Sequence, residues 1–98
     1  MAYKIIVSPL AQKEIGNAID FYKMHSADAP VNFIKVLKNA YTTLEANPFF
    51  RLQYKNIRSL KLKKFPYSLY FVIYESQSIV QVLSCFHNKR NPNKRPKH

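Results

Sequence analysis

Seven side chains in the second half of the sequence are of the types that cleave RNA without a metal. In that reaction a base activates the 2′-hydroxyl, cations stabilise the crowded phosphate, and an acid protonates the leaving oxygen. The residues are Arg58, Lys61, Lys63, Tyr70, Tyr74, His87 and Arg90. These types permit the chemistry without demonstrating it. A histidine such as His87 also commonly bonds nearby backbone at a strand end, so catalytic and structural interpretations both stay open.

Basic residues are concentrated in the same half of the chain. Residues 51–98 contain eleven Lys and Arg against one acid, Glu75, whereas residues 1–50 contain five against four. One face or end of the protein is therefore electropositive, and we expect it to attract an anionic partner: RNA, DNA or an acidic protein segment. A solubilising surface with a basic tail is the alternative. Tyrosines beside lysines further suit stacking on unpaired bases, although aromatic residues are also common in strands.

Several other classes of protein are not expected. Cys85 and His87 offer only two neighbouring metal ligands, and Gly16 is the only glycine, so neither a metal site nor a phosphate-binding glycine loop is predicted. A single cysteine cannot form an intrachain disulfide, which fits a reducing compartment. No apolar run approaches the roughly 18 residues that cross a membrane, and no signal peptide is recognisable. We expect a cytoplasmic protein that uses no cofactor, no metal and no membrane.

The first half of the sequence predicts a strand followed by two helices. Residues 3–7 are short and apolar, and Ser8-Pro9 can cap and start a helix that ends at Met24 or His25. The expected core stripe of this helix is Ala11, Ile15, Ala18, Ile19 and Tyr22. A second helix opens at residues 28–30 and must end at Asn47-Pro48. Its expected stripe is Ile34, Leu37, Tyr41 and Leu44, flanked by Phe33 and Ala40.

The second half predicts three strands. Residues 48–56 are read as a loop with anchoring aromatics, and residues 57–63 alternate with period two. Residues 67–74 are β-branched or aromatic at almost every position, as in a central strand, and residues 79–86 follow a hairpin loop. The order β-α-α-β-β-β predicts an α+β two-layer sandwich, in which a helix hairpin packs on an antiparallel sheet. We expect one domain over residues 1–87 and a loosely ordered basic tail over residues 88–98.

Strand alternation predicts which side chains face away from the helices. The core set is Leu60, Leu62, Leu69, Phe71, Ile73, Val80, Val82 and Phe86. The opposite, open face then carries Lys61, Lys63, Ser68, Tyr70, Val72, Tyr74, Gln81, Leu83, Cys85 and His87. Arg58 has the core parity but lies at a strand end. With the flanking cations, the expected target- or nucleic-acid-binding set is Arg58, Lys61, Lys63, Lys64, Tyr70, Tyr74, His87, Lys89 and Arg90.

The chain from about residue 3 to residue 92 resembles the RelE/ParE superfamily of toxins from type II toxin–antitoxin systems, often labelled plasmid-stabilisation proteins. The order and spacing of several short segments carry the resemblance. They are Ser8-Pro9-Leu10-Ala11 with Glu14-Ile15, Phe21-Tyr22, residues 29–33, Leu44 with Asn47-Pro48, Arg58-Ser59-Leu60, Tyr67-Ser68-Leu69-Tyr70-Phe71, and Val82-Leu83 running into His87-Asn88-Lys89-Arg90.

The resemblance implies a bacterial toxin whose antitoxin wraps it with an acidic or amphipathic segment. RelE-like members are ribosome-dependent endoribonucleases that cut mRNA, which would assign catalysis to Lys61, Lys63, His87 and Arg90. ParE-like members inhibit DNA gyrase and have no recognised nuclease centre. Phe21-Tyr22 and the spacing of His87 and Arg90 look more like the ParE branch, and the tail after Arg90 lacks the late tyrosine of some ribonucleases. We therefore favour a ParE-like gyrase inhibitor, with an mRNA endoribonuclease and a non-toxic binding module as alternatives.

Overall fold

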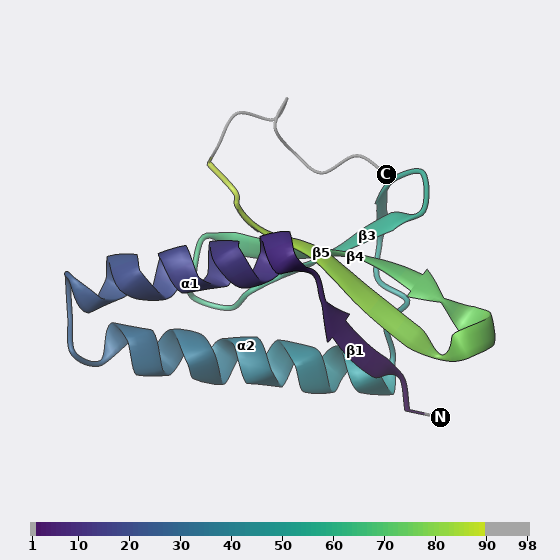
Figure 1. Cartoon of the computed structure of the whole chain (residues 1–98), viewed down its shortest axis with the longest axis horizontal. Helices are drawn as coiled ribbons and strands as arrows, with labels where there is room; N and C mark the ends of the chain where they lie inside the picture. Colours follow the sequence, from purple (N-terminus) through teal and green to yellow (C-terminus); the bar gives the residue numbers. More distant parts are fainter. Residues whose placement is uncertain (1, 90–98) are drawn as a thin grey trace.

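Two antiparallel helices cover one face of a five-stranded sheet (Figure 1). The structure is a computed structural model and describes residues 2–89. Its elements are β1 (Lys4–Val7), α1 (Pro9–Lys23), α2 (Ala29–Ala46), β2 (Leu52–Tyr54), β3 (Ile57–Lys61), β4 (Tyr67–Tyr74), the 3-10 helix η1 (Glu75–Gln77) and β5 (Ile79–His87). The predicted α+β sandwich is confirmed, with one more strand than expected.

A local sequence signal sets the start of α1 and the end of α2. The Ser8 hydroxyl oxygen accepts the Ala11 N–H at 3.2 Å and Pro9 occupies the first turn, so α1 starts as predicted. Helix α2 ends at Ala46, with Asn47 as its C-cap just before Pro48. Its buried stripe is centred on Phe33, Leu37, Ala40 and Leu44, whereas Ile34 is 36% exposed. The prediction that Ile34 faces the core is therefore wrong, because the stripe is rotated toward Phe33.

The sheet is mixed, not purely antiparallel. Its strand order is β1-β5-β4-β3-β2, and β1 runs parallel to β5, with Lys4 opposite Ile79 and Val7 opposite Val82. Hairpins fix the antiparallel pairing of β3, β4 and β5, but the helices separate β1 from its neighbour, so no turn geometry sets its direction. The segment predicted as a loop contains the edge strand β2, which pairs with β3.

Apolar side chains form two clusters, one on each face of the sheet. The main core lies between helices and sheet and includes Phe33, Leu44, Leu69, Phe71 and Val82. A smaller cluster lies on the other face. Its members are Ile57, Tyr70, Val72 and Phe86, with Leu83 packed against them. The part of the sheet formed by β3, β4 and β5 is therefore apolar on both faces.

The chain remains anchored just beyond β5. The Asn88 N–H donates to the Pro66 carbonyl, and the Ser68 hydroxyl donates to the Asn88 side chain, both at 2.8 Å. Residues 90–98 of the predicted basic tail lie outside the described residues. The boundary between domain and tail stays a prediction. Within residues 2–89, neither helix combines the length and apolarity needed to cross a membrane.

Candidate target-binding surface

An extra residue in β5 reverses the facing pattern of the strand. Phe71 pairs with Val82 but Tyr70 pairs with Ser84, so Leu83 has no partner on β4. Such a bulge sends the following side chains to the opposite face from the one that alternation predicts. Cys85 accordingly lies in the main core and Phe86 in the cluster on the other face. The predictions that Phe86 faces the helices and Cys85 the open face are wrong for this reason.

His87 lies on the helix side of the sheet. Its ring meets Tyr67, a main-core residue, edge to face at 5.0 Å, and it lines a groove together with Phe21 and Tyr22 of α1. Its Nδ1 accepts the Lys89 N–H at 3.1 Å, which is the structural role that the sequence left open. His87 is therefore separated by the sheet from Tyr70, which packs on the opposite face.

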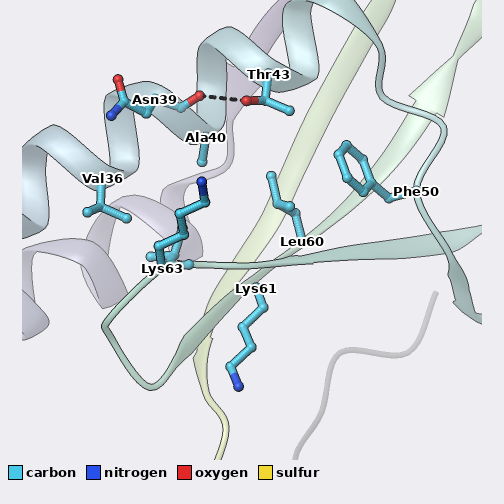
Figure 2. A pocket seen from close by; sticks show the side chains of 9 residues that line it. Val36, Asn39, Ala40, Thr43, Phe50, Leu60, Lys61 and Lys63 are labelled. Carbon is cyan, nitrogen blue, oxygen red and sulfur yellow. Dashed lines mark hydrogen bonds between the residues drawn. The ribbon is translucent and has the colours of Figure 1, made fainter.

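Lys61 and Lys63 do not share a face either. Figure 2 shows the Lys63 side chain directed toward Ala40 of α2, while Lys61 points to the opposite side of the strand. Regular alternation would have kept these two residues on one side, but β3 ends at Lys61 and the chain turns through Lys64, whose φ is +67°. Both lysines are exposed. The end of the strand thus makes the two side chains diverge, although both residues line one groove beside α2.

The two predicted tyrosines differ in how accessible they are. Tyr70 is 7% exposed and its ring lies edge to face with Phe86 at 6.1 Å. Tyr74 is 37% exposed, and its hydroxyl donates to the Gln81 side chain over a long 3.4 Å. Tyr74 and Gln81 are neighbours, as predicted. Tyr74 can offer its ring to a partner, whereas packing occupies Tyr70.

Arg58 is held by the segment before β2. Its guanidinium donates to the Phe50 carbonyl at 2.7 Å and lies 5.3 Å from the centre of the Phe49 ring. The residue pairs with Phe71, so it has the core parity that the sequence predicted. These contacts make Arg58 an anchor for residues 49–50. Arg90 lies outside the described residues.

Sequence reasoning missed Glu14, which reaches from α1 to β5. Its carboxylate accepts hydrogen bonds from the Ser84 hydroxyl at 2.6 Å and from the Cys85 N–H at 3.0 Å. In the sequence Glu14 is an ordinary polar residue of an amphipathic helix, and nothing signals a partner 70 residues away. Burial, together with the Glu14 charge, raises the pKa of the Cys85 thiol to about 12. Cys85 is therefore protonated and unreactive near neutral pH.

Two grooves flank the helix hairpin. One, of about 320 Å³, lies between α2 and β3, with Val36, Ala40, Leu60 and Leu62 in its apolar lining and Lys63 directed toward it (Figure 2). The other, of about 400 Å³, lies between α1 and the end of the β4–β5 hairpin and includes Asn17, Phe21, Tyr67 and His87. Within residues 2–89, no three His, Cys, Asp or Glu side chains gather as a metal site.

The known proteins to which this chain is similar are toxins of toxin–antitoxin systems or complexes that contain them. The family model described as "ParE toxin of type II toxin-antitoxin system, parDE" matches residues 5–92. No curated protein matches the sequence significantly. Among solved structures, the chromosomal ParDE toxin–antitoxin system from P. aeruginosa is similar with a TM-score of 0.73 and 15% identity, over 88% of this chain and 96% of that chain.

Two further solved structures share the fold at lower scores. The toxin–antitoxin complex RelBE2 from Mycobacterium tuberculosis gives a TM-score of 0.63 at 16% identity, covering 89% of this chain and 92% of that one. A mutant of the E. coli toxin RelE in the free state gives 0.62 at 17% identity, covering 91% and 86%. At these identities the structures show the common fold.

Proposed function

Because the chain belongs to the family of ParE toxins of type II toxin–antitoxin systems, we propose that it is a toxin that inhibits DNA gyrase by binding to it. It acts in the cytoplasm and cleaves no substrate. Family membership also implies a cognate antitoxin as partner. The observation that carries the choice of mechanism is the placement of His87 and Lys61 on opposite sides of the sheet.

RNA cleavage needs its base, acid and cations around one phosphate. A general base must be within hydrogen-bond reach of the proton it removes, and the cations must be close to the developing charge. His87 faces α1 and accepts the Lys89 N–H, Lys63 is directed at α2, and Lys61 projects to the other side. Tyr70 is mostly covered by packing. This dispersal supports a mode of action by binding over one by catalysis.

The exposed cations are the residues that we assign to target binding. Lys61 and Lys64 lie at the β3–β4 turn, and Lys89 follows β5. Exposed lysines of this kind steer association with acidic surfaces and make it sensitive to salt. Tyr74, near the other end of the β4–β5 hairpin, adds an accessible aromatic ring. A protein that binds its target through such contacts should lose affinity for that target gradually as single charges are removed.

The proposal is tested by two assays, one on the purified protein and one in cells that express it. Gyrase supercoiling is measured against toxin concentration, and mRNA ends are mapped by primer extension after induced expression. We expect supercoiling to be inhibited and no new mRNA ends to appear. Cleaved mRNA with normal supercoiling would instead establish the endoribonuclease alternative, and normal growth with neither effect would point to the non-toxic binding module.

Single substitutions separate the two mechanisms further. His87→Ala removes the proposed base of the ribonuclease alternative, and Lys61→Ala removes one of its cations. For a binder we expect each change to weaken gyrase inhibition by less than about tenfold, because one exposed charge contributes about 1 kcal/mol or less. Abolition of toxicity by either change, with the fold and antitoxin binding intact, would contradict the proposal.

A further inference from the structure

Strand β1 covers only the first part of the outer edge of β5. The paired stretch ends with Val7 opposite Val82, and the Ser8 N–H donates to the Val82 carbonyl at 2.9 Å before α1 begins. β5 continues to His87, and no strand formed by residues 2–89 lies beside it on that side. Its backbone groups beyond Val82 therefore need other partners.

Side chains at the start of α1 supply those partners. The Ser8 hydroxyl donates to the Leu83 carbonyl at 2.9 Å. Glu14, one and a half turns further on, accepts from the Ser84 hydroxyl at 2.6 Å and from the Cys85 N–H at 3.0 Å. These contacts fall on the bulge at Leu83 and the residues directly after it.

The bond between Glu14 and Cys85 is specific to the bulged form of β5. Lys4 and Ser8 donate to the carbonyls of Ser78 and Val82, so before the bulge the even-numbered residues of β5 turn their backbone groups toward β1. The odd-numbered residues turn theirs toward β4. In a straight strand Cys85, an odd residue, would donate toward β4. Only the extra residue at Leu83 turns its N–H outward to Glu14.

The side-chain pattern of β5 fits a straight strand equally well. Val80, Val82 and Phe86 alternate, and a straight pairing would place Phe86 opposite Tyr67 on the helix side and Cys85 opposite Ser68 on the other. Hydrophobic patterning alone would bury Phe86 in either pairing. Burial of Phe86 therefore does not decide between the two pairings, so contacts from α1, outside the β4–β5 hairpin, can contribute to the choice.

We propose that Glu14 is the positioning residue that selects the bulged register of β5 and thereby turns His87 toward α1. A hydrogen bond to a charged group favours the state that makes it by about tenfold or more, so the bond from the Cys85 N–H, which only the bulged form makes, shifts the register equilibrium by about tenfold or more. The selected register builds the groove between α1 and β5, whose lining combines His87 with Phe21. The inference does not depend on gyrase as the target.

The register is read directly by NMR on the full chain. Leu69 lies opposite Cys85 in the bulged register and would lie opposite Ser84 in the straight one. Directly opposed residues in the non-hydrogen-bonded pairs of an antiparallel ladder have Cα atoms about 4.5 Å apart. This short distance gives strong cross-strand contacts between Hα atoms. In the natural protein we expect the contact between Leu69 and Cys85. In Glu14→Ala we expect it to be replaced by a contact between Leu69 and Ser84.

Three further variants separate register selection from a general loss of stability. Glu14→Gln keeps an oxygen acceptor at the same place and should retain the Leu69–Cys85 contact. Asp20→Ala removes an exposed acid from the same helix and should also retain it. Deletion of Leu83 in the Glu14→Ala background removes the extra residue, so a regular ladder again pairs Leu69 with Cys85. This deletion should restore the contact even if Glu14→Ala alone fails to fold.

Two results would overturn the inference. The first is a Glu14→Ala protein that keeps Cys85 opposite Leu69, because Glu14 would then not select the register. The second is a failure of the Leu83 deletion to restore that pairing, because Glu14 would then act through something other than the bulge. Neither readout involves gyrase, so failure of the proposed function would be recognised separately in the supercoiling assay.

Discussion

Tyr70 and Phe86 meet edge to face, with ring centres 6.1 Å apart, on the sheet face turned away from the helices. Regular alternation places these two residues on opposite faces, and the bulge at Leu83 brings them together. The contact gives the second apolar cluster its two rings. It also withdraws Tyr70 from the surface that a partner can reach.

Truncation of Phe86 tests how much this second cluster contributes to the stability of the fold. Phe86 is 3% exposed, so we expect Phe86→Ala to lower the free energy of unfolding by about 3–5 kcal/mol. Phe21→Ala removes the same atoms from a ring that is 53% exposed and should cost much less. Denaturant unfolding of the two variants measures the difference. Equal losses would mean that the cluster does not stabilise the fold.

Lys64 offers a test that separates stability from function. Its φ of +67° is unfavourable for any residue with a Cβ, so Lys64→Gly should raise the free energy of unfolding by about 0.5–1 kcal/mol. The same change removes an exposed charge from the proposed target-binding surface, so gyrase inhibition should weaken. Thermal unfolding and supercoiling assays measure the two effects. Lys63→Gly is the control, because it removes a neighbouring charge without relieving a positive φ, and it should not stabilise the protein.

Alkaline pH should destabilise the protein through Cys85. The unperturbed pKa of a cysteine thiol is 9.0, and burial with the Glu14 charge raises the pKa of Cys85 in the folded state to about 12. Between these values the unfolded state binds fewer protons, so the free energy of unfolding falls as pH rises, by up to about 1.4 kcal/mol per pH unit for one thiol. Urea unfolding at pH 8, 9.5 and 10.5 should show this decline.

Cys85→Ala is the matched variant for that measurement. It should flatten the decline between pH 9 and 10, since no thiol remains to lose a proton. Tyr41, whose pKa burial raises from 10.0 to about 12, adds a similar decline that begins about one pH unit higher, and Tyr41→Phe should remove it. An unchanged pH dependence in Cys85→Ala would show that the thiol does not contribute.

Arg58 is expected to be structural. Arg58→Lys keeps the charge but loses the planar group that lies over Phe49 and bonds the Phe50 carbonyl, so we expect a loss of about 1–2 kcal/mol in stability. Gyrase inhibition per folded molecule should stay within about twofold, because a positive charge is retained near its place. Arg51→Lys, at an exposed position nearby, is the control and should change neither quantity. A selective loss of inhibition would make Arg58 a contact residue.

Local chemistry predicted most of the elements. Ser8-Pro9 and Asn47-Pro48 mark helix limits that depend on neighbouring residues only, and β4 begins and ends where its apolar run does. The edge strand β2 was missed because three residues are too short a run to carry a recognisable alternation. The parallel direction of β1 depends on a pairing across more than 70 residues.

The candidate surface was harder to predict than the fold. The open-face set from β4 was correct for Tyr70, Val72 and Tyr74, because that strand is regular. The set from β5 failed after Leu83, since a bulge is fixed by contacts with Glu14 on another element and leaves no mark in the pattern. Lys63 was misplaced because alternation ceases to apply where a strand ends, and the end of β3 is set by the turn at Lys64.

The parallel pairing of β1 with β5 has a consequence for synthesis of the toxin. Residues 4–7 leave the ribosome long before their partners, residues 79–82. The sheet therefore cannot close until β5 has emerged, and such long-range closure is slow compared with formation of the helix hairpin. This delay leaves an interval in which an antidote can reach the molecule before it can become harmful.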